Sequence, residues 1–487
     1  MNPPLKTAAP LPVDLMRPTR VRYGVLAFAC ALSMITYLDR VCFGTVAPYI
    51  QKEFDLTDTE KGMLFSAFAL AYALFEVPSG WLGDVFGPRR TLIRIVLWWS
   101  LFTALTGAIY PSVLSGQITL GPWEVSLAFL AMLSVRFLFG VGEAGAYPNI
   151  ARAFHNWFPF RERGFAQGTV WMAGRFAGGA TPFVVLALII ETGSGASKTV
   201  AWRHTFWIFG CIGALWCIAF WWWFRDRPEQ KASVNPAELA LIHGDEGPPE
   251  AAHARVPWGR LLGNTNLWVL CLMYFCASYG WYFNITYLPG YLERFYGLDK
   301  GAKWTAEFWE FSFLAGAPLL VGSLGCVVGG LLTDRFIHRT GNRKWGRRLF
   351  GVIGHGICAL CYFLSIFAAN PWTFVLAIAM AAFWNDITMG SAWASCIDIG
   401  KKYSGIVSGC MNTIGNLGGA MAGTATGWVL QHFQPNGWTI NFIIFGSVYV
   451  VAMLLWLRFD ATRPVVPEAA DRSPGPGGAG SPGENPL

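Results

Sequence analysis

The chain has 487 residues, of which 54% are hydrophobic and only 13% are charged. Soluble domains carry about 25% charged residues, so this composition excludes an ordinary soluble protein and indicates a chain that lies largely within a lipid bilayer. The net charge of +7 requires no nucleic-acid partner, because the basic residues gather in predicted loops on one side of the membrane.

Apolar runs long enough to cross a membrane, roughly 20 residues each, recur along the whole sequence. The run at 206–224 contains no charge and ends in tryptophans, which anchor helices at the membrane interface. The series predicts an all-α membrane protein with twelve transmembrane helices. They are expected at 23–45, 61–83, 91–110, 125–147, 164–190, 205–224, 266–288, 312–336, 349–368, 372–397, 404–430 and 439–458.

The twelve predicted helices fall into two weakly similar halves. GWLGDVFGPRR follows the second helix and TDRFIHRTGNRKWGRR follows the eighth, so that Asp84 and Asp334 occupy corresponding places. Repeats of this kind in transporters place the substrate near the bilayer midplane, between the halves. We expect two pseudo-symmetric six-helix bundles joined by a linker and flanked by two tails, the second with the proline-glycine composition of disorder. The expected bounds are 1–22, 23–224, 225–260, 261–459 and 460–487.

The basic residues predict the orientation. In segments on the same side as the N-terminus lie 25 of the 36 lysines and arginines. The positive-inside rule therefore places both termini in the cytoplasm of a multi-pass protein of the cell (inner) membrane. The first helix is long and carries Asp39 and Arg40, so we do not expect a cleaved signal peptide. The eleven cysteines show no metal or disulfide framework, and we expect neither a metal nor a cofactor.

The first predicted helix contains Asp39 next to Arg40. Neighbours on a helix point about 100° apart, so the two side chains cannot share one face. One can serve a substrate while the other contacts a different helix. Because both lie toward the outer end of 23–45, a charge pair at the mouth of the helix is the alternative.

The second helix carries Tyr72 and Glu76 on one face and leads into the loop at 80–90. Tyr72 is a candidate hydroxyl donor, and the role of Glu76 is open. A glycine here lets a neighbouring helix approach, an aspartate can face a helix N-terminus or an arginine, and paired arginines hold the loop at the anionic leaflet. Together with its second copy, this loop predicts a conformational latch built from Gly80, Asp84, Arg89, Arg90, Asp334 and Arg335.

Arg136 and Glu143 are set in the apolar stretch LAMLSVRFLFGVGEAGAYP. Seven residues separate them by about 10 Å along a helix, so they cannot simply neutralise each other. Arg136 needs an anion from elsewhere, either Asp39 or a substrate carboxylate, which an arginine fork matches. Glu143, among small residues, suits a site of proton coupling. An internal salt-bridge network that only holds helices together is the alternative.

Polar residues in later helices complete the candidate site. Arg175 is a further arginine within a predicted helix and favours an anionic ligand, unless it pairs with Glu143 or Glu76. Trp393 shares a face with Asp386 seven residues earlier, and Asn412 with Asn416 four residues later. Such polar and aromatic groups suit a polyhydroxylated ligand, although packing is the simpler explanation for each of them.

The loop at 80–90 resembles the hallmark of the major facilitator superfamily. YLDR, SAFALAYALFEVPSGWLGDVFG, RFLFGVGEAGAYPNIARAFHNWFPFRERGFAQG, YGWYFNITYLPGYL and WASCIDIGKKYSGIVSGCMNTIGNLGG resemble, more narrowly, its anion:cation symporter family, over essentially all of 23–459. That family includes bacterial hexuronate, glucarate and galactonate transporters and is related to sialin. The resemblance implies the major facilitator fold. It also implies proton coupling by Asp39 and Glu143, a central charged switch at Arg136, and substrate contacts or gating by Arg40, Tyr72, Trp393 and Asn412.

These observations predict a proton-coupled symporter, not an enzyme, that imports an organic anion. The most favoured substrate is a sugar acid such as a hexuronate, aldonate or aldarate. The expected partners are this anion, protons and the lipid bilayer, and the expected state is a monomer. Another carboxylate, aromatic or dicarboxylic, is an alternative substrate. A drug/proton antiporter is less favoured, because it would need an acidic, arginine-poor cavity, whereas Arg40, Arg136 and Arg175 all lie within predicted helices.

Overall fold

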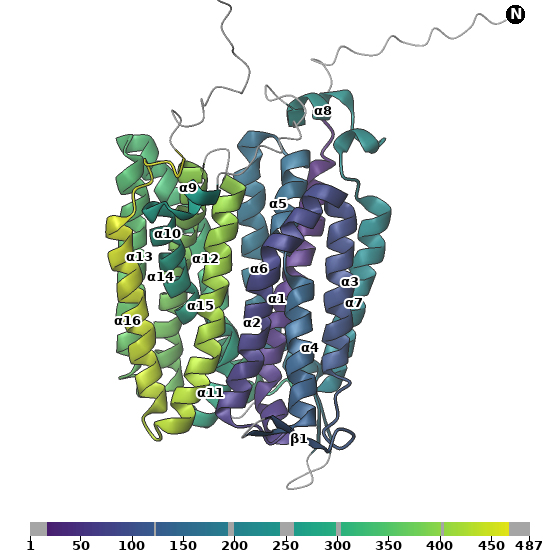
Figure 1. The fold of residues 1–487 in the computed structure, drawn as a ribbon, viewed down its shortest axis with the longest axis vertical. Helices are drawn as coiled ribbons and strands as arrows, with labels where there is room; N and C mark the ends of the chain where they lie inside the picture. Colours follow the sequence, from purple (N-terminus) through teal and green to yellow (C-terminus); the bar gives the residue numbers. More distant parts are fainter. Residues whose placement is uncertain are drawn as a thin grey trace, which may run out of the picture.

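The computed structural model describes residues 17–120, 123–192, 199–243, 258–298, 303–400 and 404–466. Long helices lie side by side in two groups (Figure 1). The N-terminal half contains α1 (Arg22–Glu53), α2 (Asp58–Phe86), α3 (Pro88–Thr106), α4 (Leu127–Glu143), α5 (Ala146–Trp157), α6 (Phe160–Leu188) and α7 (Arg203–Trp223). The C-terminal half contains α10 (Thr265–Thr286), α11 (Leu288–Tyr296), α12 (Ala306–Thr340), α13 (Arg343–Ser365), α14 (Pro371–Gly400), α15 (Ser404–His432) and α16 (Gly437–Arg458).

Short elements mark the two ends of the bundle (Figure 1). At one end, which we call the linker end, lie α8 (Pro236–His243) and α9 (Trp258–Leu262), with a 3-10 turn at Pro228–Gln230 between α7 and α8. At the other, the hairpin end, β1 (Gln117–Leu120) pairs antiparallel with β2 (Trp123–Ser126). A second antiparallel pair joins β3 (Ile190–Thr192) to β4 (Thr199–Ala201).

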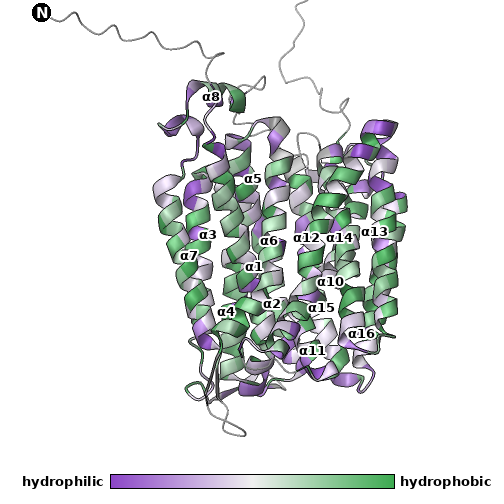
Figure 2. Ribbon diagram, turned by 180° about the vertical axis from the view of Figure 1, so that it is seen from behind, coloured by the Kyte–Doolittle hydropathy of each residue, from purple (hydrophilic) through white to green (hydrophobic). Residues whose placement is uncertain are grey.

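The helices have the character of membrane spans. Apolar residues dominate along their middles and polar residues gather at the two ends (Figure 2). Within the described residues, nine helical segments are long and apolar enough to cross a membrane by length and composition alone. Helices α3, α10 and α15 fall outside that group, because arginines, tyrosines and asparagines, or many glycines, lower their mean hydropathy.

The same helix pairing recurs in both halves. In the N-terminal half α1 packs on α6, α2 on α4, and α3 on α7; in the C-terminal half α10 packs on α15, α12 on α14, and α13 on α16. When α4–α5 and α10–α11 are each counted as one span, both halves contain six described spans. In each half the first span then packs on the fifth, the second on the fourth, and the third on the sixth. Between the halves, α2 packs along α15 and α6 along α12.

Two predicted helices differ from the observed ones. The span expected at 23–45 continues to Glu53, with Pro48 inside the helix, so Arg40 lies near the middle of α1 and not at its mouth. The span expected at 125–147 breaks after Glu143, where Gly145 adopts φ +85°. A Cβ at Gly145 would lie 2.3 Å from the Cβ of Ser79, so only glycine fits this turn.

The described ends of the chain pack on the bundle. Glu238 of α8 is buried and accepts hydrogen bonds from the Thr19 hydroxyl (2.5 Å) and the Arg22 guanidinium (3.1 Å). Asp460 pairs with Lys344 at 2.7 Å, and the Val465 N–H donates to the Ile399 carbonyl. Residues 460–466 therefore belong to the packed structure. Of the predicted tails at 1–22 and 460–487, residues 1–16 and 467–487 lie outside the described residues, as do residues 244–257 of the predicted linker.

Candidate functional site

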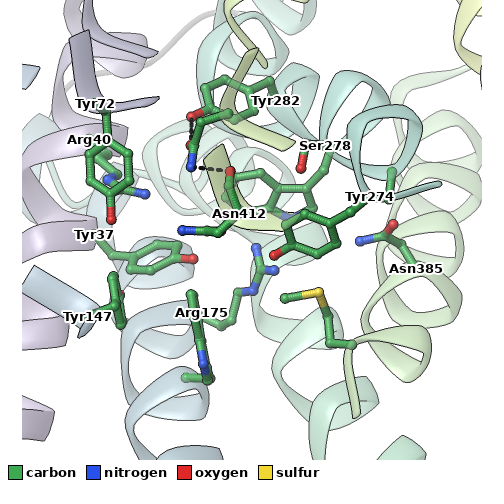
Figure 3. Close-up of a pocket in the computed structure, with 15 residues that line it drawn as sticks. Tyr37, Arg40, Tyr72, Tyr147, Arg175, Tyr274, Ser278, Tyr282, Asn385 and Asn412 are labelled. Atoms are coloured by element: carbon green, nitrogen blue, oxygen red, sulfur yellow. Dashed lines mark hydrogen bonds between the residues drawn. The ribbon is translucent and has the colours of Figure 1, made fainter. Parts of the chain in front are cut away.

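A cavity that is partly open to its surroundings lies between the two halves. Figure 3 shows side chains from both halves facing the same space. Arg40, Tyr72, Arg175 and Asn385 lie close to the midpoints of α1, α2, α6 and α14, so the cavity is at half the depth of the bundle. Its lining residues are Tyr37, Arg40, Tyr72, Tyr147, Trp171, Arg175, Tyr274, Ala277, Ser278, Trp281, Tyr282, Asn385, Met389, Asn412 and Asn416.

Arg40 is one of two cations in the cavity wall. Its Nε lies 2.5 Å from the Oε1 of Glu143, which is fully buried at the end of α4. The guanidinium also lies 4.8 Å from the ring centre of Tyr72, and its Nη2 is buried without a hydrogen-bond partner. The break after Glu143 leaves carbonyl groups at the end of α4, a position that favours a nearby cation. Arg40 thus has one buried donor that no described group accepts.

Asp39 and Arg136 lie behind this wall, within the N-terminal half. Asp39 is buried, neither of its oxygens has a hydrogen-bond partner, and Arg136, Glu143 and Thr103 are the polar groups around it. Arg136 lies 4.1 Å from the ring centre of Phe43. The prediction that neighbouring Asp39 and Arg40 face different surroundings is confirmed, since only Arg40 lines the cavity. Arg136 is not among the lining residues, and its predicted contact with substrate stays a prediction.

Arg175 is the second cation of the cavity wall. Its Nη2 lies 3.0 Å from the Oδ1 of Asp386 on α14, and the two side chains are only 4% and 1% exposed. The same carboxylate oxygen accepts the Asn385 side-chain amide at 3.1 Å. Arg175 also lies 4.1 Å from the ring centre of Trp281. The partner of Arg175 is therefore neither Glu143 nor Glu76, but a carboxylate from the opposite half.

A second polar contact between the halves joins Glu76 to Asn412, whose side-chain amide donates to the buried carboxylate. The amide of Asn416 donates to the Asn412 carbonyl at 2.9 Å, and its oxygen accepts the Tyr282 hydroxyl at 3.0 Å. These hydrogen bonds orient two asparagine side chains that line the cavity. Asn412 lines the cavity, and Glu76 contacts it from behind. The predicted contact of Asn412 with substrate stays a prediction.

Aromatic side chains complete the wall. Tyr147 stacks on Trp171 with ring centres 4.3 Å apart, and Trp171 in turn lies 5.7 Å from Trp393 of the other half. Trp393 itself is not a lining residue. Of the aromatic residues that line the cavity, only Tyr72 was predicted individually as a site residue. The spacing of the lining residues on α10 could have predicted them. Tyr274, Ser278 and the pair Trp281–Tyr282 recur at intervals of three or four residues, which places them on one helix face.

The halves are in close contact on the hairpin side of the cavity. Ser66 donates to the Ala420 carbonyl and accepts the Thr424 N–H at 2.8 Å, and Arg294 pairs with Asp58 at 3.0 Å. The described hydrogen bonds and ring contacts between halves lie at the level of the cavity or on this side of it. This arrangement is that of a carrier closed at the hairpin end.

The predicted latch is only partly described, because the side chains of Asp84 and Asp334 lie outside the described set. The Arg89 backbone N–H donates to Asp226 at 2.8 Å, and its guanidinium lies 4.1 Å from a ring centre of Trp221. The close helix approach occurs at Gly83, where a Cβ would lie 1.8 Å from the Asn149 Oδ1. At Gly80, where the approach was predicted, a Cβ would meet Pro148 at an ordinary 3.4 Å. Arg90 and Arg335 are exposed.

Comparison with known proteins shows to which family this chain belongs. The sequence profile of the Major Facilitator Superfamily matches residues 29–423 and 341–481. A probable sulfoacetate transporter (SauU) of Cupriavidus necator is 32% identical over 440 residues, which cover 89% of this chain and 93% of that protein. A probable galactarate/D-glucarate transporter (GudP) of Escherichia coli K12 is 28% identical, with 85% of this chain and 88% of that protein covered.

Other known proteins agree with this placement. A hexuronate transporter of Bacillus subtilis is 25% identical over 95% of this chain and 98% of its own length. Among solved structures, a bacterial homolog of the human lysosomal transporter Spinster, inward-facing and occupied, superposes with a TM-score of 0.66 at 18% identity, covering 90% of this chain and 97% of that one. All of these proteins are transporters, not enzymes. The chain is thus an integral, multi-pass membrane transporter that belongs to the major facilitator superfamily, among its anion:cation symporter-like members.

Proposed function

We propose that the chain is a proton-coupled symporter that imports an organic anion, a sugar acid such as a hexuronate, aldonate or aldarate. The observation that carries this proposal is the pair of buried guanidinium groups, Arg40 and Arg175, in the wall of a cavity between the halves. Guanidinium groups bind carboxylates with charge-assisted hydrogen bonds, and each of these two has a buried donor without a partner. A cavity for cationic drugs would lack such groups.

The charges in and behind the cavity support proton coupling. Three guanidinium groups face four carboxyl groups, so the fully ionised cluster has a net charge of −1: Arg40, Arg136, Arg175, Asp39, Glu76, Glu143 and Asp386. An anion that enters this cluster adds negative charge to a buried site, which is unfavourable unless a carboxyl group takes up a proton. We assign proton uptake to Glu143 and Asp39, and anion binding to Arg40 and Arg175.

The exchange of partners at Arg40 gives the coupling a direct mechanism. Glu143 occupies the guanidinium that a substrate carboxylate would use. When Glu143 accepts a proton, its hold on Arg40 weakens and the substrate carboxylate can replace it. Release of the anion lets Glu143 pair with Arg40 again and lose its proton. The walls supply hydroxyl and amide groups, such as Tyr72 and Asn412, for the hydroxyls of a sugar acid.

A small dianion is the second candidate substrate. The relative that is 32% identical bears the name of a probable sulfoacetate transporter. Sulfoacetate carries a sulfonate and a carboxylate, and two separate guanidinium groups in one cavity suit two anionic groups.

The basic loops at the linker end support a cytoplasmic location for that end, in the cell (inner) membrane. The cavity is built by a single chain, so we propose that the transporter acts as a monomer.

Uptake by purified protein in proteoliposomes tests the proposal. The probes are labelled D-glucuronate, D-galactonate, D-glucarate and sulfoacetate, each offered with and without an inward proton gradient. We expect accumulation of at least one probe that requires the gradient. Glu143→Gln is expected to retain exchange of internal for external probe and to lower accumulation, whereas the control Glu229→Gln, at the linker end, keeps both. Accumulation by Glu143→Gln equal to that of the unmodified protein would refute its coupling role.

A further inference from the structure

Asp386 is a buried carboxylate that the proposed function does not yet use. It lies on α14 with 0% exposure, and its Oδ2 has no hydrogen-bond partner. Two glycines of α12 make room for it, because a Cβ at Gly322 would lie 2.6 Å from that oxygen and one at Gly325 would lie 3.3 Å from the Asp386 Cβ. The carboxylate is therefore fixed in the C-terminal half by tight packing.

The partner of Asp386 belongs to the other half. Arg175 on α6 approaches it at 3.0 Å and simultaneously lines the cavity. The Nε and Nη1 of Arg175 are buried without hydrogen-bond partners. A ligand anion that reaches the cavity can therefore bind the same guanidinium that holds Asp386.

The ion pair joins two bodies that must move relative to each other during transport. Breaking a buried pair while both groups remain charged leaves two uncompensated charges in a medium of low polarity, which is strongly unfavourable. The other ionisable groups that face Asp386 are neutral in their ordinary states and cannot replace the guanidinium. They come from α1, α12, α13 and α16, and they are Tyr37, Cys326, Cys358 and Tyr449.

We propose that Asp386 is a further coupling residue, in the C-terminal half, which takes up a proton when the substrate anion replaces it on Arg175. This inference rests on the proposed function and adds one proton-binding site to it. The charges balance: a neutral ion pair, one anion and one proton become a neutral arginine–anion pair and a neutral carboxyl group. On release, the anion and the proton leave, and the ion pair re-forms across the halves.

Proton uptake upon anion binding tests the proposal directly. Calorimetry of the purified, detergent-solubilised chain in buffers of different ionisation enthalpy gives the protons bound per anion, with sulfoacetate or D-glucarate as the probe, whichever the unmodified protein transports. Asp386→Asn is expected to take up one proton fewer per anion than the unmodified protein. Asp386→Ser is a second neutral variant in case the first does not give monodisperse protein. The matched control is Asp398→Asn, which removes a carboxylate of the same helix that pairs within its own half, with Arg347 at 2.9 Å.

Transport gives an independent readout. At zero membrane potential and a gradient of one pH unit, loss of one coupled proton lowers the final accumulation ratio about tenfold. Asp386→Asn is expected to show this loss, to keep exchange of internal for external probe, and to have a lower KM because Arg175 has lost its competitor. If it takes up as many protons and accumulates as much anion as Asp398→Asn, the inference is overturned. If the unmodified protein shows no proton-driven accumulation at all, it is the proposed function that fails.

Discussion

Gly316→Ala should open the hairpin end of the transporter. Gly316 of α12 faces Gly179 of α6, and a Cβ at position 316 would lie 1.9 Å from the Gly179 carbonyl oxygen. The closest favourable distance between a carbon and a carbonyl oxygen is about 3.3 Å. The two helices would therefore have to separate by about 1.4 Å at this point. Both partners are backbone, so no side chain can rotate away. Gly330→Ala is the matched control on the same helix, since a Cβ there meets nothing within 4 Å.

The magnitude follows from the penalty for overpacking. Inserting a methyl group into a closely packed contact costs about 1–3 kcal/mol, and the penalty applies only to the state that is closed at the hairpin end. The population of the open state should therefore rise about 5–150-fold relative to the closed state. The helices themselves should remain folded, because the steric conflict lies between the halves.

Cysteine labelling measures this shift. Ser278 lines the cavity, so a Ser278→Cys background reports access to the cavity when a membrane-impermeant maleimide is added from the hairpin side. Gly316→Ala is expected to speed labelling by the factor above, and Gly330→Ala to leave the rate within about twofold. Equal labelling rates in the two variants would refute the assignment of this contact as the closure, provided that both variants have the same melting temperature.

Three further outcomes are expected. Gly83→Ala should lower stability by about 1–3 kcal/mol in thermal unfolding, because a Cβ would collide with the Asn149 side chain, whereas Gly80→Ala should change it by less than about 0.5 kcal/mol. Ser66→Ala removes hydrogen bonds between the halves and should speed labelling of Ser278→Cys from the hairpin side, without a change in melting temperature. Glu238→Ala leaves several donors without their acceptor and should accelerate trypsin cleavage near the N-terminus.

The helices were predictable because lipid imposes a simple rule on sequence. A span must be apolar over roughly 20 residues, and this rule places most helix ends within a few residues of those observed. It fails where the end depends on other parts of the fold. The break after Glu143 exists because Gly145 closely approaches Ser79. The sequence stays apolar through this point, so the sequence pattern does not predict the contact. Likewise, α1 extends past 45 to Glu53 because its last turns are covered by protein.

Part of the candidate site was predictable, since Arg40, Tyr72 and Asn412 line the cavity, but the pairing of its charged residues was not. Helical geometry alone separated Asp39 from Arg40, because neighbours on a helix diverge by about 100°. The partner of Arg175, however, is 211 residues away on another half. Which carboxylate it meets depends on how the halves dock, and periodicity within one helix contains no information about docking. The role of Asp386 was open for that reason, and the structure gives it a partner.

Contacts between the halves differ in a way that bears on how the carrier cycles. At the hairpin end they include hydroxyl–backbone hydrogen bonds and a pair, Arg294–Asp58, whose side chains are 45% and 19% exposed. Such contacts exchange with water at little cost when the halves part. At the cavity, the Arg175–Asp386 pair is almost fully buried, and parting its two charges without compensation would cost about 3–5 kcal/mol. The most deeply buried of these ion pairs therefore lies at the cavity, so we expect substrate binding to act on the Arg175–Asp386 pair more than on the contacts at the hairpin end.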